Sequence, residues 1–154
     1  RVVVGKSWFG EENVKDEYTC KVQKEAEKVR NKIIFTGFVN PDKMPLMYQI
    51  ADCLVVPSIW EEPFGVVALE GMASGLPLIV TNSGGLPEIV NDKCAVIVNK
   101  EKDIVNNLTD EMNKMMINEA KAKKMGECAR ETVQSNLEYD SRNYFGLFLK
   151  KTIG

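Results

Sequence analysis

Short apolar runs rich in β-branched residues recur along the chain, and polar segments of helical composition separate them. The runs cover residues 2–4, 33–35, 54–56, 78–80 and 95–98. The intervening segments cover residues 16–30, 43–51, 65–74 and 87–91. Such runs are typical of strands buried on both faces, and alternation of strand with helix favours a parallel sheet. The sequence therefore predicts an α/β fold with a Rossmann-like, doubly wound parallel sheet.

After residue 98 the pattern changes to long, charged helical sequence with no further strand. We expect helices over residues 102–117, 119–136 and 139–151, which either wrap the edge of the sheet or reach another domain. The 154 residues are 44% hydrophobic and contain no internal repeat or linker. This predicts a single domain over residues 1–154, with a core in about residues 1–100 and extra C-terminal helices in about 101–154.

Composition narrows the class of partner and the compartment. The 20 basic and 22 acidic residues nearly cancel, so nothing in the charge favours nucleic acid as a partner. The four cysteines lie at wide intervals without the spacing of a zinc site or a redox dithiol, which indicates a reducing compartment. No segment reaches the roughly 20 apolar residues that a membrane span requires. We therefore expect a cytoplasmic protein.

The loop after residues 54–56 places two carboxylates beside a helix start. It reads Pro-Ser-Ile-Trp-Glu-Glu-Pro-Phe-Gly over residues 57–65 and runs directly into the next helix. The unpaired N–H groups at the start of that helix suit a diphosphate. Glu70 can reach back with two acceptor oxygens for a ribose diol, and Glu62 can accept hydrogen bonds from sugar hydroxyls. The spacing alone also fits glutamates that are favoured there by the helix dipole.

A second glycine-rich loop follows the next predicted strand. Gly84 and Gly85 stand between residues 78–80 and a further helix start, so their backbone is expected beside the first loop. Paired glycines by themselves mark ordinary turns more often than ligand loops. This loop therefore indicates a binding site only in combination with the first one.

Together these motifs resemble one family of enzymes. Glu-Pro-Phe-Gly at residues 62–65, Glu70, and Gly-Gly-Leu-Pro-Glu at residues 84–88 are similar to the motifs of the retaining glycosyltransferases of family 4, also called glycosyl transferases group 1. This family includes sucrose synthase-like and mannosyltransferase-type enzymes with the GT-B fold. The resemblance covers about residues 2–98 and implies that the chain is the C-terminal, donor-binding half of such an enzyme.

The resemblance implies a role for each motif. Glu62 is the implied catalytic residue, which contacts the donor sugar without acting as a covalent nucleophile. The implied donor-binding residues are Phe64, Gly65 and Val66 at the diphosphate, Glu70 at the ribose, Gly37, Phe38 and Val39 at the base, and Gly84 and Gly85. The implied donor is a UDP- or GDP-sugar. The family works without a bound metal, in agreement with a chain that has no histidine and no Asp-x-Asp, and no cofactor is expected.

Two parts of the family pattern are not found in the sequence. Residues 2–4 resemble the second strand of the domain, so the first strand, with its Gly-Arg loop and lysine, is missing, and the N-terminal acceptor domain is also absent. Arg1 stands where an initiator methionine would. We therefore expect a fragment that is inactive by itself. Because the first strand is central in the family's strand order, 3-2-1-4-5-6, its loss is expected to expose strand edges and to favour dimerisation or a rearranged pairing of the strands.

Two alternatives remain open from the sequence. A nucleotide-sugar epimerase of the GT-B fold binds the same ligand, and a non-catalytic nucleotide-sugar-binding subunit fits the absence of an acceptor half. A nicotinamide-dependent oxidoreductase is disfavoured because the chain lacks Gly-x-Gly-x-x-Gly after a strand. The resemblance implies sugar transfer with retention of configuration in polysaccharide or glycolipid synthesis. It leaves open a membrane-associated acceptor and a location peripheral to the membrane.

Overall fold

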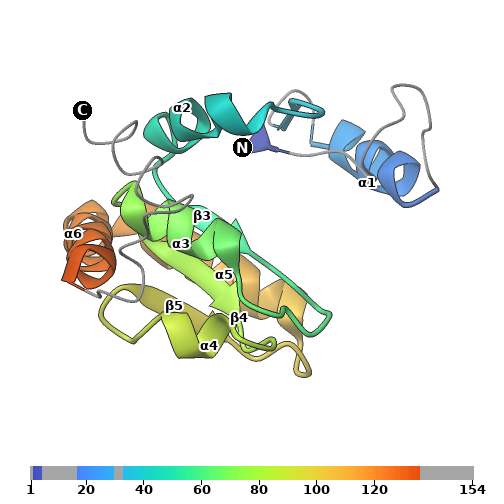
Figure 1. The fold of residues 1–154 in the computed structure, drawn as a ribbon. Helices are drawn as coiled ribbons and strands as arrows, with labels where there is room; N and C mark the ends of the chain where they lie inside the picture. The colour runs from blue at the N-terminus through green and yellow to red at the C-terminus, as the bar shows by residue number, and fades with distance from the viewer. Residues whose placement is uncertain (1, 5–16, 30–32, 136–154) are drawn as a thin grey trace. The chain divides into compact units, whose positions relative to one another are not determined.

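The computed structural model describes residues 2–4, 17–29 and 33–135, within two compact units, Arg1–Met44 and Pro45–Gly154 (Figure 1). In the first unit, β1 (Val2–Val3) pairs in parallel with β2 (Ile34–Phe35). In the second unit, β3 (Leu54–Val56), β4 (Leu78–Thr81) and β5 (Ala95–Val98) form a parallel sheet in that order. The α/β class with parallel strands is confirmed, and each strand lies on a predicted apolar run, with β4 extending one residue beyond its run.

The five strands pair as two sheets, whereas the sequence predicts one. One sheet holds β1 and β2, and the other holds β3, β4 and β5. In the expected order 3-2-1-4-5-6, these two groups are joined only through the first strand. The described strands therefore keep the neighbours that the expected order gives them, and the two groups form separate sheets.

The first unit contains one longer helix and a short turn of helix. α1 (Glu17–Glu27) lies within the predicted segment 16–30. The 3-10 helix η1 (Pro41–Lys43) begins after Asn40, whose side chain accepts a hydrogen bond from the Asp42 N–H at 3.0 Å. This side-chain cap and a proline at the first helical position are the usual signals of a helix start. The chain continues from η1 into α2 (Met44–Gln49).

β4 is the centre of the second unit. All four of its residues are buried, because β3 and β5 flank it and helices cover the sheet. α3 (Val66–Ala73) lies on one face of this sheet and α5 (Ile104–Ile117) on the other (Figure 1). The short α4 (Leu86–Ile89) lies between β4 and β5 in the chain. This is the doubly wound arrangement that the alternating pattern predicts.

Two glycines shape α3: Gly71 lets it pack closely on the Leu54 side chain of β3, and Gly75 ends it. A Cβ added to Gly71 would lie 2.3 Å from Leu54 Cδ2, so a larger residue here would force the Leu54 side chain to shift. Gly75, with a φ of 78°, ends the helix. The N–H groups of Gly75 and Leu76 donate to the carbonyls of Met72 at 2.9 Å and Gly71 at 3.0 Å. This Schellman pairing satisfies the last carbonyls and turns the chain into β4.

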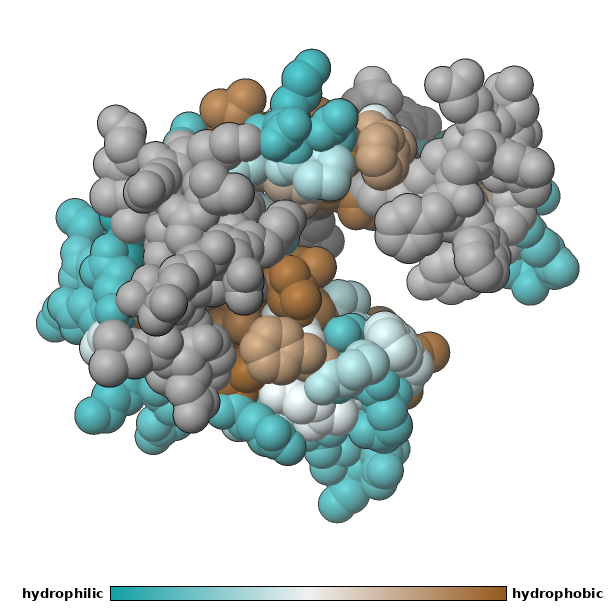
Figure 2. Space-filling view, viewed as in Figure 1, coloured by the Kyte–Doolittle hydropathy of each residue, from teal (hydrophilic) through white to brown (hydrophobic). Residues whose placement is uncertain are grey.

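α6 (Glu119–Ser135) packs on α3 through one apolar face. Met125, Ala129 and Val133 on that face are buried. The opposite face carries charged side chains and is hydrophilic at the left edge of the view in Figure 2. The sequence predicts this helix over residues 119–136, and the structure shows that it covers α3. The third predicted helix, over residues 139–151, lies outside the described residues.

Candidate functional site

Two loops at the carboxyl ends of β3 and β4 lie against each other. The first covers residues 57–65 and the second residues 82–85. The Gly85 N–H donates to the Glu62 carbonyl at 2.7 Å. A Cβ added to Gly84 would lie only 2.2 Å from the same carbonyl oxygen, and Gly84 has a φ of 51°. Glycine at position 84 thus permits both the backbone conformation and the close approach, and the two loops predicted from sequence are brought together.

The start of α3 exposes backbone donors beside these loops. Gly65 is the N-cap residue, has a φ of 80° and makes no side-chain capping hydrogen bond. Its carbonyl accepts the N–H groups of Ala68 at 2.9 Å and Leu69 at 3.2 Å. Within the described part of the chain, no acceptor pairs with the N–H groups of Val66 and Val67, whose side chains are exposed. Unpaired donors at the positive end of a helix dipole favour a bound anion.

Glu62 is half-buried on the first loop. No residue in the described ranges forms a hydrogen bond or ion pair with its carboxylate. Phe64, which the sequence also assigns to donor binding, is 47% exposed on the same loop. The carboxylate and the exposed ring are therefore available to a ligand near the α3 start.

Glu70 is nearly buried within α3. Its residue exposure is 5%, and its Oε2 accepts a hydrogen bond from the Tyr48 hydroxyl of α2 at 2.8 Å. A buried carboxylate requires such donors, because an ionised group without partners is costly in an apolar interior. Tyr48 thus orients Glu70. The sequence prediction does not include Tyr48, although a glutamate on a buried helix signals that a donor must lie nearby.

Lys100, which follows β5, is a second residue that the sequence prediction does not include. Its ammonium forms an ion pair with Glu61, and a lysine at the carboxyl end of a parallel strand is the signal that could have identified it. This contact holds the pKa of the Glu61 carboxyl below its ordinary value, and the N–H of Gly84 acts in the same direction. Glu61 is therefore ionised at neutral pH.

The predicted base-binding residues lie in the first unit and are described there alone. Gly37 has a φ of 68°, and its carbonyl accepts the Thr36 hydroxyl at 3.0 Å. Phe38 is 65% exposed, and Val39 is half-buried. The exposed ring is available for apolar contact.

Among the residues that the structure describes, no group of three histidine, cysteine, aspartate or glutamate side chains lies close enough to hold a metal ion. None of the helices described is long and apolar enough to cross a membrane.

Comparison with known proteins identifies the family of this chain. The family model "Glycosyl transferases group 1" matches residues 1–132. An uncharacterized glycosyltransferase of Methanocaldococcus jannaschii is 53% identical over 62 residues, 40% of this chain and 16% of that protein. A GDP-mannose-dependent alpha-(1-6)-phosphatidylinositol monomannoside mannosyltransferase of Mycobacterium tuberculosis is 32% identical over 120 residues, 73% of this chain and 31% of that protein.

A solved structure agrees with the sequence matches. The sucrose-phosphate synthase of Thermosynechococcus elongatus is similar with a TM-score of 0.75 and 28% identity, over 87% of this chain and 33% of that one. The chain spans about a third or less of the length of these three proteins. The family match includes both loops and α3. The chain therefore belongs to the glycosyl transferases group 1 family.

Proposed function

We propose that this chain is the donor-binding part of a retaining glycosyltransferase of family 4, which transfers a sugar from a UDP- or GDP-sugar to an acceptor. The observation that carries the proposal is the contact between loops 57–65 and 82–85 beside the uncapped start of α3. The GDP-mannose dependence named for the Mycobacterium tuberculosis relative supports a nucleotide-sugar donor.

Each part of the candidate site suits one part of such a donor. The N–H groups of Val66 and Val67 bind the diphosphate, which the positive end of the α3 dipole stabilises. Glu70, oriented by Tyr48, accepts hydrogen bonds from the ribose hydroxyls. Glu62 accepts hydrogen bonds from the sugar hydroxyls and thereby orients the reacting carbon.

In this scheme the bond between the sugar's anomeric carbon and the diphosphate oxygen breaks. The acceptor oxygen forms its bond to that carbon from the same face, so configuration is retained. The acceptor's proton passes to the departing phosphate oxygen, and no protein residue needs to act as a covalent nucleophile. The contribution of this chain is electrostatic, because its N–H groups stabilise the charge that develops on the leaving diphosphate.

Calorimetric titration in buffer with EDTA tests the proposal. The ligands are UDP, GDP, UDP-glucose and GDP-mannose, and the proteins are wild type, Glu70→Gln and Glu62→Gln. We expect Glu70→Gln to weaken every nucleotide by about 10- to 100-fold, the usual cost of hydrogen bonds to a charged group. Glu62→Gln should weaken only the nucleotide-sugar, because free diphosphates do not reach it.

A matched control and a second assay complete this test. Glu127→Gln changes an exposed glutamate on α6 and should leave all affinities unaltered. Incubation of a nucleotide-sugar with the protein as its gene encodes it then distinguishes a transferase from an epimerase and from a non-catalytic binding subunit. Nucleoside diphosphate released when an acceptor is added indicates a transferase, whereas a nucleotide-linked epimer indicates an epimerase. Binding without either product indicates a binding subunit and contradicts the proposal.

A further inference from the structure

Lys100 forms hydrogen bonds with residues of the loops that follow β3 and β4, and it lies on the loop that follows β5. Its side chain is only 15% exposed, which is low for a lysine. The ammonium forms an ion pair with Glu61 on the loop after β3 and donates to the Ser83 hydroxyl on the loop after β4 at 3.4 Å. The backbone N–H of Lys100 donates to Asn82 Oδ1 at 2.7 Å. One residue thus contacts both loops of the candidate site.

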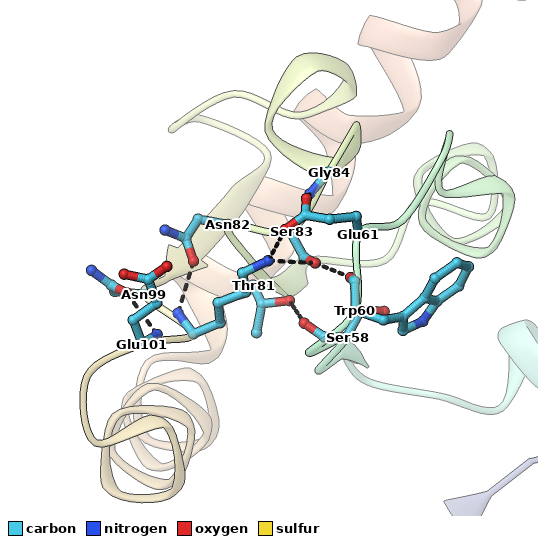
Figure 3. A network of polar contacts seen from close by, with 10 residues as sticks. Ser58, Trp60, Glu61, Thr81, Asn82, Ser83, Gly84, Asn99 and Glu101 are labelled. Atoms are coloured by element: carbon cyan, nitrogen blue, oxygen red, sulfur yellow. Dashed lines mark hydrogen bonds and ion pairs between the residues drawn. The ribbon is translucent and has the colours of Figure 1, made fainter.

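Two further hydrogen bonds join the loops after β3 and β4, from Ser83 to Trp60 and from Gly84 to Glu61 (Figure 3). Glu61 Oε2 accepts the Gly84 N–H at 2.9 Å. The Ser83 hydroxyl donates to the Trp60 carbonyl. The Glu61 side chain is 76% exposed, so burial does not fix its position. The charge of Lys100 and the N–H of Gly84 hold it in place.

The contacts of Lys100 and Gly84 with Glu61 involve the residue directly before Glu62. Glu61 and Glu62 are adjacent, and the Glu62 carbonyl accepts the Gly85 N–H at 2.7 Å. Loss of the Lys100 charge would leave this backbone hydrogen bond in place but would remove the ion pair that holds the preceding side chain. Lys100 therefore acts on the residue that precedes Glu62, and among the described residues no hydrogen bond or ion pair joins Lys100 to Glu62 itself.

We propose that Lys100 is a positioning residue for donor recognition, which holds Glu61 against Ser83 and Gly84 and so sets the direction in which Glu62 meets the donor sugar. The inference rests on the proposed function. Glu70 and the start of α3 form none of these contacts. The role of Lys100 is therefore specific to the sugar and does not extend to the nucleotide.

Calorimetric titration of the protein as its gene encodes it tests this role. Wild type, Lys100→Met, Lys100→Arg and Glu61→Gln are compared, with UDP, GDP, UDP-glucose and GDP-mannose as ligands. We expect Lys100→Met and Glu61→Gln to weaken the nucleotide-sugar about tenfold, as loss of one charge-assisted hydrogen bond does, and the free diphosphates by less than about twofold. Lys100→Arg keeps the charge and should restore most of the affinity. Lys102→Met, at an exposed lysine two residues away, is the matched control and should behave as wild type.

The selectivity between nucleotide-sugar and free nucleotide decides the outcome. Equal loss for both ligands, or no loss for either, overturns the role of Lys100. If Lys100→Met does not fold, Glu61→Gln carries the test, because it alters an exposed side chain and keeps an acceptor for the Gly84 N–H. Wild-type protein that binds no nucleotide overturns the proposed function, and this inference with it. Wild-type protein that binds, with variants that match it, overturns the inference alone.

Discussion

Replacement of Gly84 by alanine tests whether contact between the two loops is a structural requirement. The added Cβ would lie 2.2 Å from the Glu62 carbonyl oxygen and 2.5 Å from its nitrogen. Both are backbone atoms, so no side-chain rotation can relieve the clash. The residue also has a φ of 51°, a conformation that alanine adopts only with strain.

The expected cost has two parts. Left-handed backbone costs a non-glycine residue about 1 to 2 kcal/mol. Overpacking against atoms that must shift costs about 1 to 3 kcal/mol more. Gly75→Ala separates these parts, because Gly75 has a φ of 78° and nothing lies within 3.6 Å of an added Cβ. We therefore expect Gly75→Ala to lower the free energy of unfolding by about 1 to 2 kcal/mol, and Gly84→Ala by about 2 to 5 kcal/mol.

Urea unfolding followed by far-ultraviolet circular dichroism measures both variants against wild type. α3, α5 and α6 all lie in the second unit, so the helical signal reports on the unit that contains Gly84. The same proteins are titrated with UDP and GDP. Gly84→Ala should also weaken nucleotide binding, and Gly75→Ala should not. Equal destabilisation by the two substitutions would refute the inferred contact of Gly84 with Glu62.

Three further substitutions or reactions test other contacts. Gly126→Ala would place a Cβ 2.1 Å from the Gly75 carbonyl oxygen, so α6 must shift. We expect a cost of about 1 to 3 kcal/mol, seen as a melting temperature lower by several degrees. An unchanged melting curve would contradict this packing of α6 on Gly75. Tyr48→Phe removes the hydroxyl that donates to Glu70 and should cost about 1 to 3 kcal/mol in urea unfolding, whereas a cost near zero would show that this hydrogen bond is dispensable. Burial raises the pKa of Cys53 to about 11. At pH 9 its thiol should therefore react with iodoacetamide about fifty times more slowly in the folded than in the urea-unfolded protein, and equal rates by mass spectrometry would argue against burial.

The strands and most helices could be predicted because their signals are local. The bounds of β3 and β5 coincide with the predicted runs, and α3 starts and ends within one residue of its predicted segment. A buried strand needs only a short β-branched run, and a glycine such as Gly75 marks a helix end from its own backbone preference. The pairing into two sheets could not be predicted from such local signals, because it depends on which strand edges meet.

The partners within the candidate site could be predicted only in part. Glu62 and Gly84 carry recognisable motifs, and the structure brings their loops together. Glu61 and Lys100 are 39 residues apart, and an isolated lysine in a loop has the same sequence pattern whether it is solvated or paired. The Tyr48 hydroxyl of α2 likewise pairs with a carboxylate on another helix, that of Glu70 on α3. The pairing of side chains from distant segments can be found only when the fold is known, whereas the motifs can be recognised from the sequence alone.

The most direct measurement of donor binding is a nuclear magnetic resonance titration of the ¹⁵N-labelled chain with UDP, GDP and ADP in buffer with EDTA. We predict saturable shifts of amide signals, concentrated in residues 64–67 and 84–85, for at least one of the three nucleotides. The absence of shifts with all three, or shifts concentrated on α5 and α6, would contradict a donor site at the start of α3.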